Sequence, residues 1–417
     1  MVLVIVLALP LLALVNDEPP LPSAAISDPI VMPLPEIDGN AWRTRGQLVS
    51  QEPYKPPFDD HDAVLGNAWR AVYRSLSGVD GAVRDVSGAF FLPRGTPPPD
   101  GWPVISAAHG TTGIGNDCGP SRQPDLQGYA PLVQSLLSDG YAVALTDYEG
   151  LGAQGAHPYL EPRTAAFNTI DAVRALRRLT PLVSTRWVAL GYSQGGQAVW
   201  AANELDDFYG HDLQLMGSVA LAPSANATPA ADLAWNGSLT EQQRALLPLF
   251  VISLARYNPG LDTRAFLHGS DEAHRKRLSH CKPADREAHR TSLPVPVPWA
   301  SVVGRVRESN ELRPTTQADV AELREALRKI ALPQRPLTKP MLVIAGGRDS
   351  LVLPVWVKTA VSQSCALGGR IQFTEIASAD HQTILWKAAP RVEHWIADRF
   401  AGIEAKSTCA QRAPSDK

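Results

Sequence analysis

Short apolar runs alternate with helical stretches from residue 103 onward, and this rhythm constrains the fold more than any other feature of the chain. The apolar runs lie at 104–108, 141–146, 187–190 and 213–221, and the helical stretches lie at 126–137, 165–179 and 194–205. This alternation is typical of a mostly parallel sheet that is built from βαβ units and covered by helices on both faces. Upstream, alternating patterns at 68–74 and 82–92 flank a Gly-containing turn and predict an antiparallel hairpin.

The strand rhythm stops after Pro223 and returns only at 341–344. We interpret residues 224–338 as an insertion with helices at 240–256 and 316–330, which divides an α/β core into residues 59–223 and 339–417. A helix at 354–363, a strand at 370–376 and a helix at 391–400 complete the second part of the core. The insertion interrupts the sheet near the carboxyl ends of its strands, which is where α/β enzymes place their sites.

The chain begins with fifteen apolar residues that stop at Asn16. This run is short for a membrane span and suits the apolar region of a signal peptide, which we place at 1–22. No positive residue precedes the run, so a membrane anchor or a misassigned start is the alternative. Residues 23–58 are Pro-rich and lack an apolar period, which predicts an arm or linker. We therefore expect a secreted protein, with association with the cell envelope as an alternative.

Composition places the chain among ordinary folded proteins, with 44% hydrophobic residues, 19% charged residues and a formal net charge of −3. No stripe or block of Lys and Arg occurs, which argues against a nucleic-acid partner. The four cysteines form no C-x-x-C pair and therefore do not suggest a zinc site. An even number of cysteines in an exported chain instead predicts two disulfides, for which the sequence leaves three connectivities open.

The stretch GYSQG places Ser193 between Gly191 and Gly195, directly after the apolar run 187–190 and before a helix. In a G-x-S-x-G elbow, the small flanking residues permit a sharp turn from strand to helix that lifts the serine hydroxyl above the sheet. The pentapeptide alone would also suit a Gly-rich turn without chemistry. Its position between a strand and a helix favours a nucleophile.

A serine nucleophile needs a base, a carboxylate that orients the base, and donors for the oxyanion. On this architecture the acid and then the histidine follow the serine. Asp349 ends a Gly-containing loop after the strand at 341–344, and His381 follows the strand at 370–376. Asp380 is a rival acid, but an adjacent residue in an extended loop usually points away from the imidazole. We predict Asp349 as the orienting acid and His381 as the base.

The loop HGTTG, residues 109–113, follows the strand at 104–108. In this architecture that loop gives one backbone N–H to the oxyanion hole, and the residue after the nucleophile gives the other. We predict the N–H groups of Thr111 and Gln194 as the donors. Thr112 is the alternative to Thr111, and a plain glycine turn is the interpretation without function.

Other polar residues near the expected strand ends have different assignments. His157 follows a loop and could line the cleft, whereas His274, His280 and His289 lie in a charged stretch of the insertion and are expected to be solvated. Asp147 also ends a strand, but it precedes the nucleophile, against the expected order of the triad. We therefore assign Asp147 to hydrogen bonding that supports the cleft.

Five stretches, HGTTG, TDYEGLG, GYSQGGQA, GGRDSLV and ADHQTIL, together resemble the secretory lipase family, which includes fungal lipase A. The resemblance covers about residues 60–410. It implies an α/β-hydrolase fold with a cap after residue 223 and a triad of Ser193, Asp349 and His381.

The same resemblance implies a pairing for the cysteines, Cys118 with Cys281 and Cys365 with Cys409. The first bond would tie the oxyanion loop to the cap. The second would hold the C-terminal tail.

Motifs and resemblance together predict hydrolysis of carboxylic esters through an acyl-enzyme on Ser193, without a metal or organic cofactor. A triacylglycerol lipase is the leading interpretation. A short-chain carboxylesterase, an acyltransferase or a peptidase would share the triad, and a non-catalytic lipid-binding surface protein would be a different class. The stretch 246–255 is apolar all round, as an acyl-binding surface or the cap's own buried helix would be. We expect a lipid or small ester substrate, transient contact with a lipid interface, and a monomer.

Overall fold

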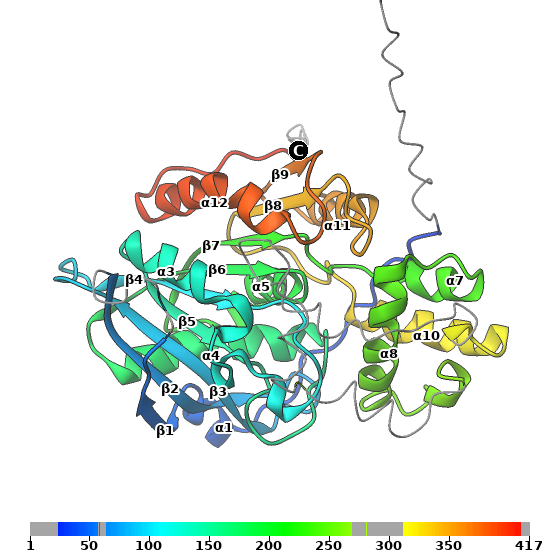
Figure 1. Cartoon of the computed structure of the whole chain (residues 1–417), viewed down its shortest axis with the longest axis horizontal. Coiled ribbons are helices and arrows are strands. Elements are labelled where there is room, and N and C mark those ends of the chain that lie inside the picture. Colours follow the sequence, from blue (N-terminus) through cyan, green and yellow to red (C-terminus); the bar gives the residue numbers. More distant parts are fainter. Residues whose placement is uncertain (1–23, 57, 59–63, 269–280, 282–311, 410–417) are drawn as a thin grey trace, which may run out of the picture.

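A computed structural model describes residues 24–56, 58, 64–268, 281 and 312–409 of the chain. Its described residues form a nine-stranded sheet with the order β1-β2-β3-β5-β4-β6-β7-β8-β9 (Figure 1). The strands are β1 Leu48–Pro53, β2 Leu65–Leu76, β3 Val83–Pro93, β4 Trp102–Ala108, β5 Ala142–Thr146, β6 Val183–Tyr192, β7 Gln214–Leu221, β8 Met341–Gly346 and β9 Ile371–Ile376.

The sheet is antiparallel at one edge and parallel over the rest. β1, β2, β3 and β5 pair antiparallel in that order, and the pairs from β5 through β4, β6, β7 and β8 to β9 are parallel. Every residue of β5 and β8 is buried, as expected for strands covered on both faces. The predicted mostly parallel sheet with an upstream hairpin is confirmed.

The described helices cover both faces of the sheet and extend beyond one end of it. They are α1 Gly39–Thr44, α3 Ala130–Ser138, α4 Pro162–Leu179, α5 Gln194–Glu204, α6 Asp206–Tyr209, α7 Pro229–Trp235, α8 Glu241–Ala255, α10 Gln317–Ile330, α11 Pro354–Ala366 and α12 Ile384–Phe400. Buried residues of α4, α5 and α11 belong to the apolar core on one face, and those of α3 and α12 belong to the core on the other. None of these helices combines the length and hydropathy needed to cross a bilayer.

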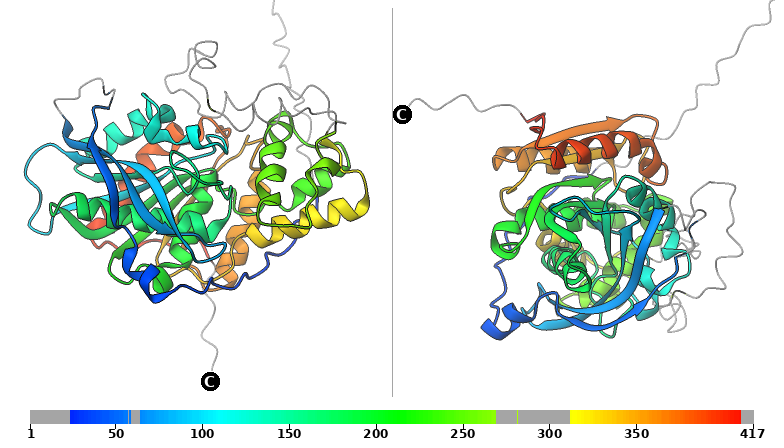
Figure 2. Two further views of the ribbon diagram at one scale, coloured as in Figure 1. Left: turned by 90° about the horizontal axis from the view of Figure 1, so that it is seen from below. Right: turned by 90° about the vertical axis from the view of Figure 1, so that its left-hand side faces the viewer.

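Helices α7, α8 and α10 gather beyond one end of the sheet, where Figures 1 and 2 show them beside the core. All three lie within 224–338, the segment predicted as an insertion. Helix α8 begins with a capping box formed by Thr240 and Gln243. The same two side chains reach the loop that follows β8, because Thr240 Oγ1 donates to the carbonyl of Ser350 (2.7 Å) and Gln243 Nε2 donates to that of Leu351 (3.1 Å). The start of the cap helix is thereby fixed to the core.

Part of the segment 23–58, expected as an arm or linker, is built into the sheet. Leu48–Pro53 forms β1 and pairs with β2 along its length. No alternating pattern marks these residues, because none of them is buried and β1 is an edge strand. Earlier residues do run along the surface, where Ser27 N–H donates to Thr228 Oγ1 and Met32 N–H donates to Gln334 Oε1. The predicted signal peptide at 1–22 lies outside the described residues.

Helix α12 begins seven residues before the predicted start at 391, and α7 has no counterpart among the predicted helices. Pro390 lies inside α12, and a proline usually ends a helical pattern.

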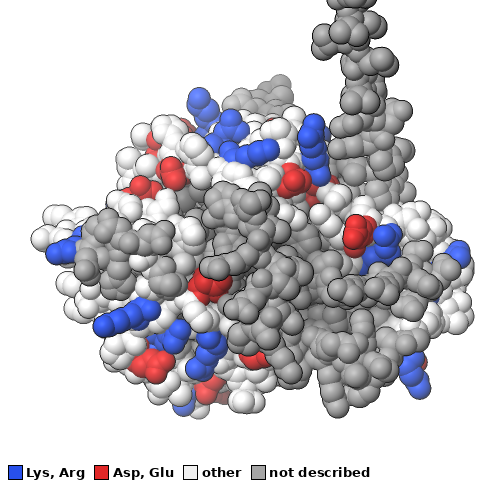
Figure 3. Space-filling model, in the orientation of Figure 1, with Lys and Arg blue, Asp and Glu red and all other residues white. Residues whose placement is uncertain are grey.

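On the face of the molecule in Figure 3, the visible Lys and Arg side chains are scattered among Asp and Glu and form no continuous patch.

Candidate active site

The predicted site residues follow four strands of the parallel part of the sheet, at their carboxyl ends. Thr111 follows β4, Ser193 follows β6, Asp349 follows β8 and His381 follows β9. Parallel strands place these ends at one edge of the sheet, which is where open α/β folds form their sites. The structure brings all four residues together at that edge.

Ser193 occupies a sharp turn between β6 and α5. Its backbone has φ 57° and ψ −115°, a strained conformation for a residue with a side chain. A Cβ on Gly191 would lie 2.0 Å from the carbonyl oxygen of Gly195, and one on Gly195 would lie 1.8 Å from that of Ala108. The turn therefore requires both glycines of the G-x-S-x-G sequence, as a nucleophile elbow does.

A continuous hydrogen-bonded chain joins Ser193, His381 and Asp349. Ser193 Oγ lies 2.9 Å from His381 Nε2, and His381 Nδ1 lies 2.6 Å from Asp349 Oδ2. Ser193, His381 and Asp349 are 4%, 1% and 0% exposed, so the hydrogen bonds between them are shielded from bulk water. In this arrangement Nδ1–H donates to the carboxylate, which leaves Nε2 free to accept the serine proton.

The second oxygen of Asp349 fixes the carboxylate. Asp349 Oδ1 accepts the backbone N–H groups of Leu351 (2.9 Å) and Val352 (2.8 Å). The rival acid Asp380 instead accepts hydrogen bonds from Gln382 and Thr383, just before α12. Partial burial raises the pKa of Asp380, but these hydrogen bonds outweigh burial and lower it overall.

The two predicted oxyanion residues flank the serine. Thr111 and Ser193 line one small pocket together with His381, and Gln194 is the first residue of α5. Two tyrosine hydroxyls hold the loop at 109–113: Tyr129 accepts the N–H of Gly110 (2.6 Å), and Tyr159 bonds Thr111 Oγ1 (2.6 Å). A helix N-terminus and a fixed loop supply the backbone N–H groups that an oxyanion hole uses.

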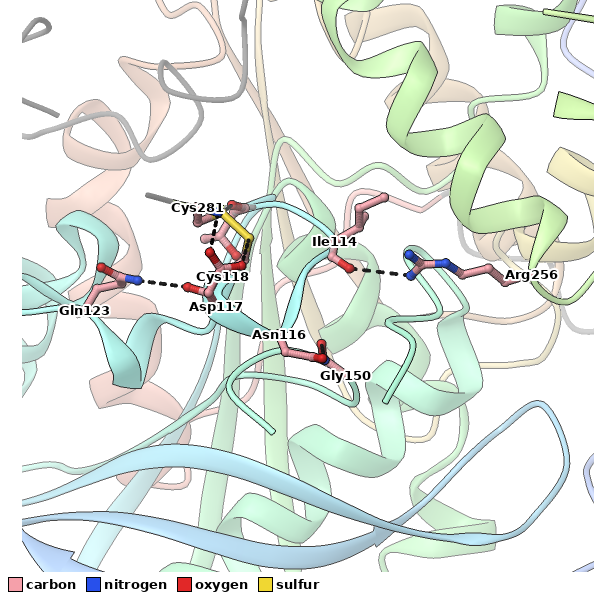
Figure 4. The surroundings of a disulfide bond; sticks show 9 residues. Ile114, Asn116, Asp117, Cys118, Gln123, Gly150, Arg256 and Cys281 are labelled. Carbon is pink, nitrogen blue, oxygen red and sulfur yellow. Dashed lines mark hydrogen bonds between the residues drawn. A yellow bond between two sulfur atoms is a disulfide. The ribbon is translucent and has the colours of Figure 1, made fainter. Parts of the chain in front are cut away.

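The loop at 109–113 also contacts a disulfide. Figure 4 shows the bond between Cys118 and Cys281, and the structure contains a second bond between Cys365 and Cys409. A Cβ on Gly113 would lie 2.5 Å from Cys118 Sγ and 2.8 Å from Cys281 Sγ, so the first disulfide packs directly on the loop. Both pairings are those that the family resemblance implies.

Asp147, which follows β5, is buried and held by hydrogen bonds. Its Oδ2 accepts the hydroxyls of Ser87 (2.5 Å) and Ser121, and its Oδ1 accepts the N–H of Ser121 (2.8 Å). Burial raises the pKa of the Asp147 carboxyl, against the opposing effect of these hydrogen bonds. Asp147 contacts neither Ser193 nor His381 through any of these bonds.

Two further histidines lie buried near the serine. Burial lowers the pKa of His109 to about 4 and that of His157 to about 3, so both are neutral at pH 7. His157 Nε2 lies 3.0 Å from Gln194 Nε2, a contact that its sequence position did not predict because the partner is 37 residues away. His274, His280 and His289 lie outside the described residues.

An apolar pocket opens from Ser193 toward the cap. Its wall includes Leu246, Leu247, Phe250, Leu351, Val352 and Trp356. Three residues of the apolar stretch 246–255 line this pocket, and Leu249, Val251 and Leu254 are buried in the apolar core.

The sheet order, the sharp turn after β6 and the helices beyond one end of the sheet define an α/β-hydrolase fold. A sequence model named Secretory lipase matches residues 125–408, and the chain belongs to that family. A Mycobacterium tuberculosis protein called a "probable inactive lipase" is 25% identical over 284 residues, which are 65% of this chain and 58% of the relative. The chain therefore spans less than two thirds of that relative.

Solved structures share the fold along most of the chain. Candida antarctica lipase A in its closed state has a TM-score of 0.67 and 18% identity, with 94% of this chain and 91% of that chain covered. The rice cell wall degrading esterase LipA from Xanthomonas oryzae has a TM-score of 0.65 and 20% identity, with 86% and 97% covered. At this level of identity the likeness establishes the fold.

Proposed function

We propose that the chain is a secreted serine hydrolase that cleaves carboxylic esters, and that its substrates are triacylglycerols. The observation that carries the proposal is the buried chain of hydrogen bonds from Ser193 through His381 to Asp349. Family membership and the lipase and esterase folds that it resembles support the same class of reaction.

The reaction proceeds by acyl transfer. Ser193 Oγ attacks the ester carbonyl carbon while His381 Nε2 takes the hydroxyl proton, and the resulting oxyanion accepts the N–H groups of Thr111 and Gln194. The tetrahedral intermediate breaks its bond to the alcohol oxygen, which leaves with the proton from His381. Water then attacks the acyl-enzyme by the same path and releases the carboxylic acid. Asp349 keeps the imidazole in the required tautomer throughout.

The pocket beside Ser193 supports an aliphatic acyl group as the part of the substrate that the protein recognises. Apolar side chains from α8 and from the loop after Asp349 line the pocket together. A hydrocarbon chain bound there would be removed from water and would lie against these apolar side chains. We assign 224–338 to a cap that closes this pocket, with the core in 59–223 and 339–417.

The two disulfides support the secreted location, because such bonds persist in oxidising compartments. We retain 1–22 as the signal peptide in this proposal. Expression of the full-length sequence, followed by N-terminal sequencing of the protein in the medium, tests this assignment. Protein in the medium that still begins at Met1 would contradict cleavage.

Labelling with a fluorophosphonate tests whether the serine reacts at all. We expect one label per chain on Ser193 and none on Ser193→Ala, since the reagent requires a serine activated by its base. The test matters because a relative is named an inactive lipase, and a non-catalytic lipid-binding protein would keep this fold without a reactive serine. Absence of label from the folded protein would favour that second function.

A chain-length series of p-nitrophenyl esters then separates the hydrolases from one another. A triacylglycerol lipase should prefer long acyl chains and gain activity once the substrate forms an interface. Preference for acetyl or butyryl esters without an interfacial gain would instead indicate a short-chain carboxylesterase. An acyltransferase would give more ester product than acid when a free alcohol is present, and a peptidase would cleave the matched amide.

A further inference from the structure

Residues 157–159, which we call the bridge segment, lie between the oxyanion residues and the cap helix α8. His157 and Tyr159 are each 2% exposed, and they contact residues that are distant in sequence on both sides. On the side of the serine they reach the side chains of Gln194 and Thr111. On the side of the cap they reach Ser253 of α8.

The contact between His157 and Gln194 has a defined direction. His157 Nδ1 lies 2.7 Å from the backbone carbonyl of Glu149, which can only accept, so Nδ1 carries the proton. The ring is neutral, because burial lowers the pKa of His157 to about 3, and Nε2 is therefore an acceptor. Gln194 Nε2 donates to it at 3.0 Å. This bond holds the side chain of the residue whose N–H is proposed as an oxyanion donor.

The contact between Tyr159 and Thr111 holds the second oxyanion residue. The Tyr159 hydroxyl and Thr111 Oγ1 lie 2.6 Å apart, and both residues are buried. The ring of Tyr159 also packs edge-on against Phe250 of α8, with 5.3 Å between the ring centroids. Tyr159 and Phe250 both line the apolar pocket beside the serine. One side chain therefore contacts both the oxyanion loop and the space proposed for the acyl group.

Side chains of α8 and of the residues after it bond the backbone of the bridge segment. Ser253 Oγ donates to the carbonyl of His157 (2.9 Å) and accepts the N–H of Tyr159 (2.9 Å), so one hydroxyl spans the segment. The residues after α8 add two more bonds, from the Tyr257 hydroxyl to the carbonyl of Tyr159 (3.0 Å) and from Arg256 to the carbonyl of His157 (3.2 Å). Ser253 itself is fully buried, so no water competes for these bonds.

Arg256 reaches the far end of the oxyanion loop as well. Figure 4 shows its guanidinium directed at the carbonyl of Ile114, which follows the loop at 109–113, with a distance of 3.5 Å. In the same view, the Cys118–Cys281 disulfide lies on the opposite side of Ile114 from Arg256. The loop is thus held between the disulfide and the residues that end α8.

We propose that His157 and Tyr159 are positioning residues that set the geometry of both oxyanion donors, and that contacts with α8 set the place of these two residues. The inference rests on the proposed function, because it concerns the oxyanion site of that reaction. It predicts that loss of a bond in the bridge segment slows acylation of Ser193 while leaving ester binding unchanged. Donors that stabilise an oxyanion act only in the transition state, so their displacement lowers kcat rather than raising KM.

The test compares two tyrosine variants of the full-length, disulfide-bonded protein. Tyr159→Phe removes the hydroxyl that bonds Thr111 and keeps the ring against Phe250. Tyr209→Phe is the matched control, because its buried hydroxyl bonds Asp171 of α4, and the described hydrogen bond and ring contacts of Tyr209 do not involve the bridge segment. For each protein we would measure the acylation rate constant with a p-nitrophenyl ester, KM, the melting temperature and the affinity for an alkyl trifluoromethyl ketone.

We expect Tyr159→Phe to lower the acylation rate about 10-fold at unchanged KM, a smaller loss than the roughly 10²–10³-fold effect of removing an oxyanion donor outright. Affinity for the trifluoromethyl ketone should fall by the same factor, because its adduct with Ser193 places an oxyanion on the same donors. Tyr209→Phe should lower the melting temperature without either effect. A merely structural role for Tyr159 would give the pattern of the control.

Two further variants keep the inference testable if Tyr159→Phe folds poorly. Thr111→Val removes the other partner of the same bond, so its effect should match that of Tyr159→Phe, and the double variant should be no slower than either single variant. Ser253→Ala removes both bonds from α8 to the bridge segment and should slow acylation in the same direction.

The outcomes separate this inference from the proposed function. If the unchanged protein is labelled by the fluorophosphonate and hydrolyses the ester, but Tyr159→Phe, Thr111→Val and Ser253→Ala acylate as fast as Tyr209→Phe, the inference alone is overturned. If the unchanged protein is neither labelled nor active, the proposed function is overturned and the inference falls with it.

Discussion

At the scale of single residues, His381 is fixed at three points. Asp349 holds Nδ1, Ser193 faces Nε2, and the hydroxyl of Tyr192 donates to the backbone carbonyl of His381 (2.6 Å). The first two partners could be predicted because serine, acid and histidine each follow a recognisable apolar strand. The tyrosine contact could not, because its partners are 189 residues apart and a hydroxyl carries no sequence pattern that names its acceptor.

Substitution of the two neighbouring acids separates orientation of the base from simple proximity. Asp349→Asn should lower kcat by about 10³–10⁴, because an amide nitrogen facing Nδ1 favours the wrong imidazole tautomer. Asp380→Asn should leave kcat within about 2-fold, since Asp380 bonds the start of α12 and not the ring. Steady-state hydrolysis of a p-nitrophenyl ester measures kcat of both variants. A larger loss of kcat in Asp380→Asn than in Asp349→Asn would show that Asp380 orients the base.

At the scale of elements, most of the strands in the parallel part of the sheet could be predicted because they are buried. Apolar runs marked β4 to β8, whose residues are mostly buried between helices. The edge strand β9 was predicted as well, although only its Ile371 is buried. The edge strand β1 and the first two turns of α12 were missed for two different physical reasons, exposure in β1 and Pro390 within α12. Which loops meet at the strand ends was predictable from parallel pairing, whereas the hold of α8 on the bridge segment depends on the fold of the cap.

The two disulfides join different elements, so their removal should have different effects. Cys118→Ser with Cys281→Ser should lower kcat about 10-fold or more, because the bond packs on Gly113 of the oxyanion loop. Cys365→Ser with Cys409→Ser opens a loop with a sequence separation of 44, which in the chain-entropy model lowers the free energy of unfolding by at most about 4 kcal/mol. The second pair should keep kcat, since it joins α11 to the C-terminal tail. Denaturant unfolding and ester hydrolysis would be measured on both double variants. A loss of kcat in the second pair, with kcat unchanged in the first pair, would contradict this prediction.

At the scale of the whole molecule, buried ionisable groups act on stability in opposite directions. Burial raises the pKa of Glu149 to about 7, that of Asp206 to about 6 and that of Glu204 to about 8. Folding favours the protonated form of these acids, so stability falls as pH rises from their ordinary values toward the raised ones. His109 and His157 have lowered pKa values, so stability falls as pH drops below about 6.5, where the unfolded histidines gain protons. We therefore expect a broad stability maximum between about pH 4.5 and 6.5.

Glu204 should account for much of the loss on the alkaline side, and Glu204→Gln tests this. Its carboxylate accepts the backbone N–H groups of Gln334 and Arg335, an acceptor role that an amide oxygen can keep. Ionisation of this buried group lowers the free energy of unfolding by up to about 1.4 kcal/mol per pH unit between its unfolded and folded pKa values. Urea unfolding at pH 5.5 and pH 8 should show a smaller decline in Glu204→Gln than in the unchanged protein, and Glu322→Gln, at an exposed position of α10, should decline as the unchanged protein does. Equal declines in all three proteins would mean that Glu204 ionises in the folded chain at its ordinary pKa.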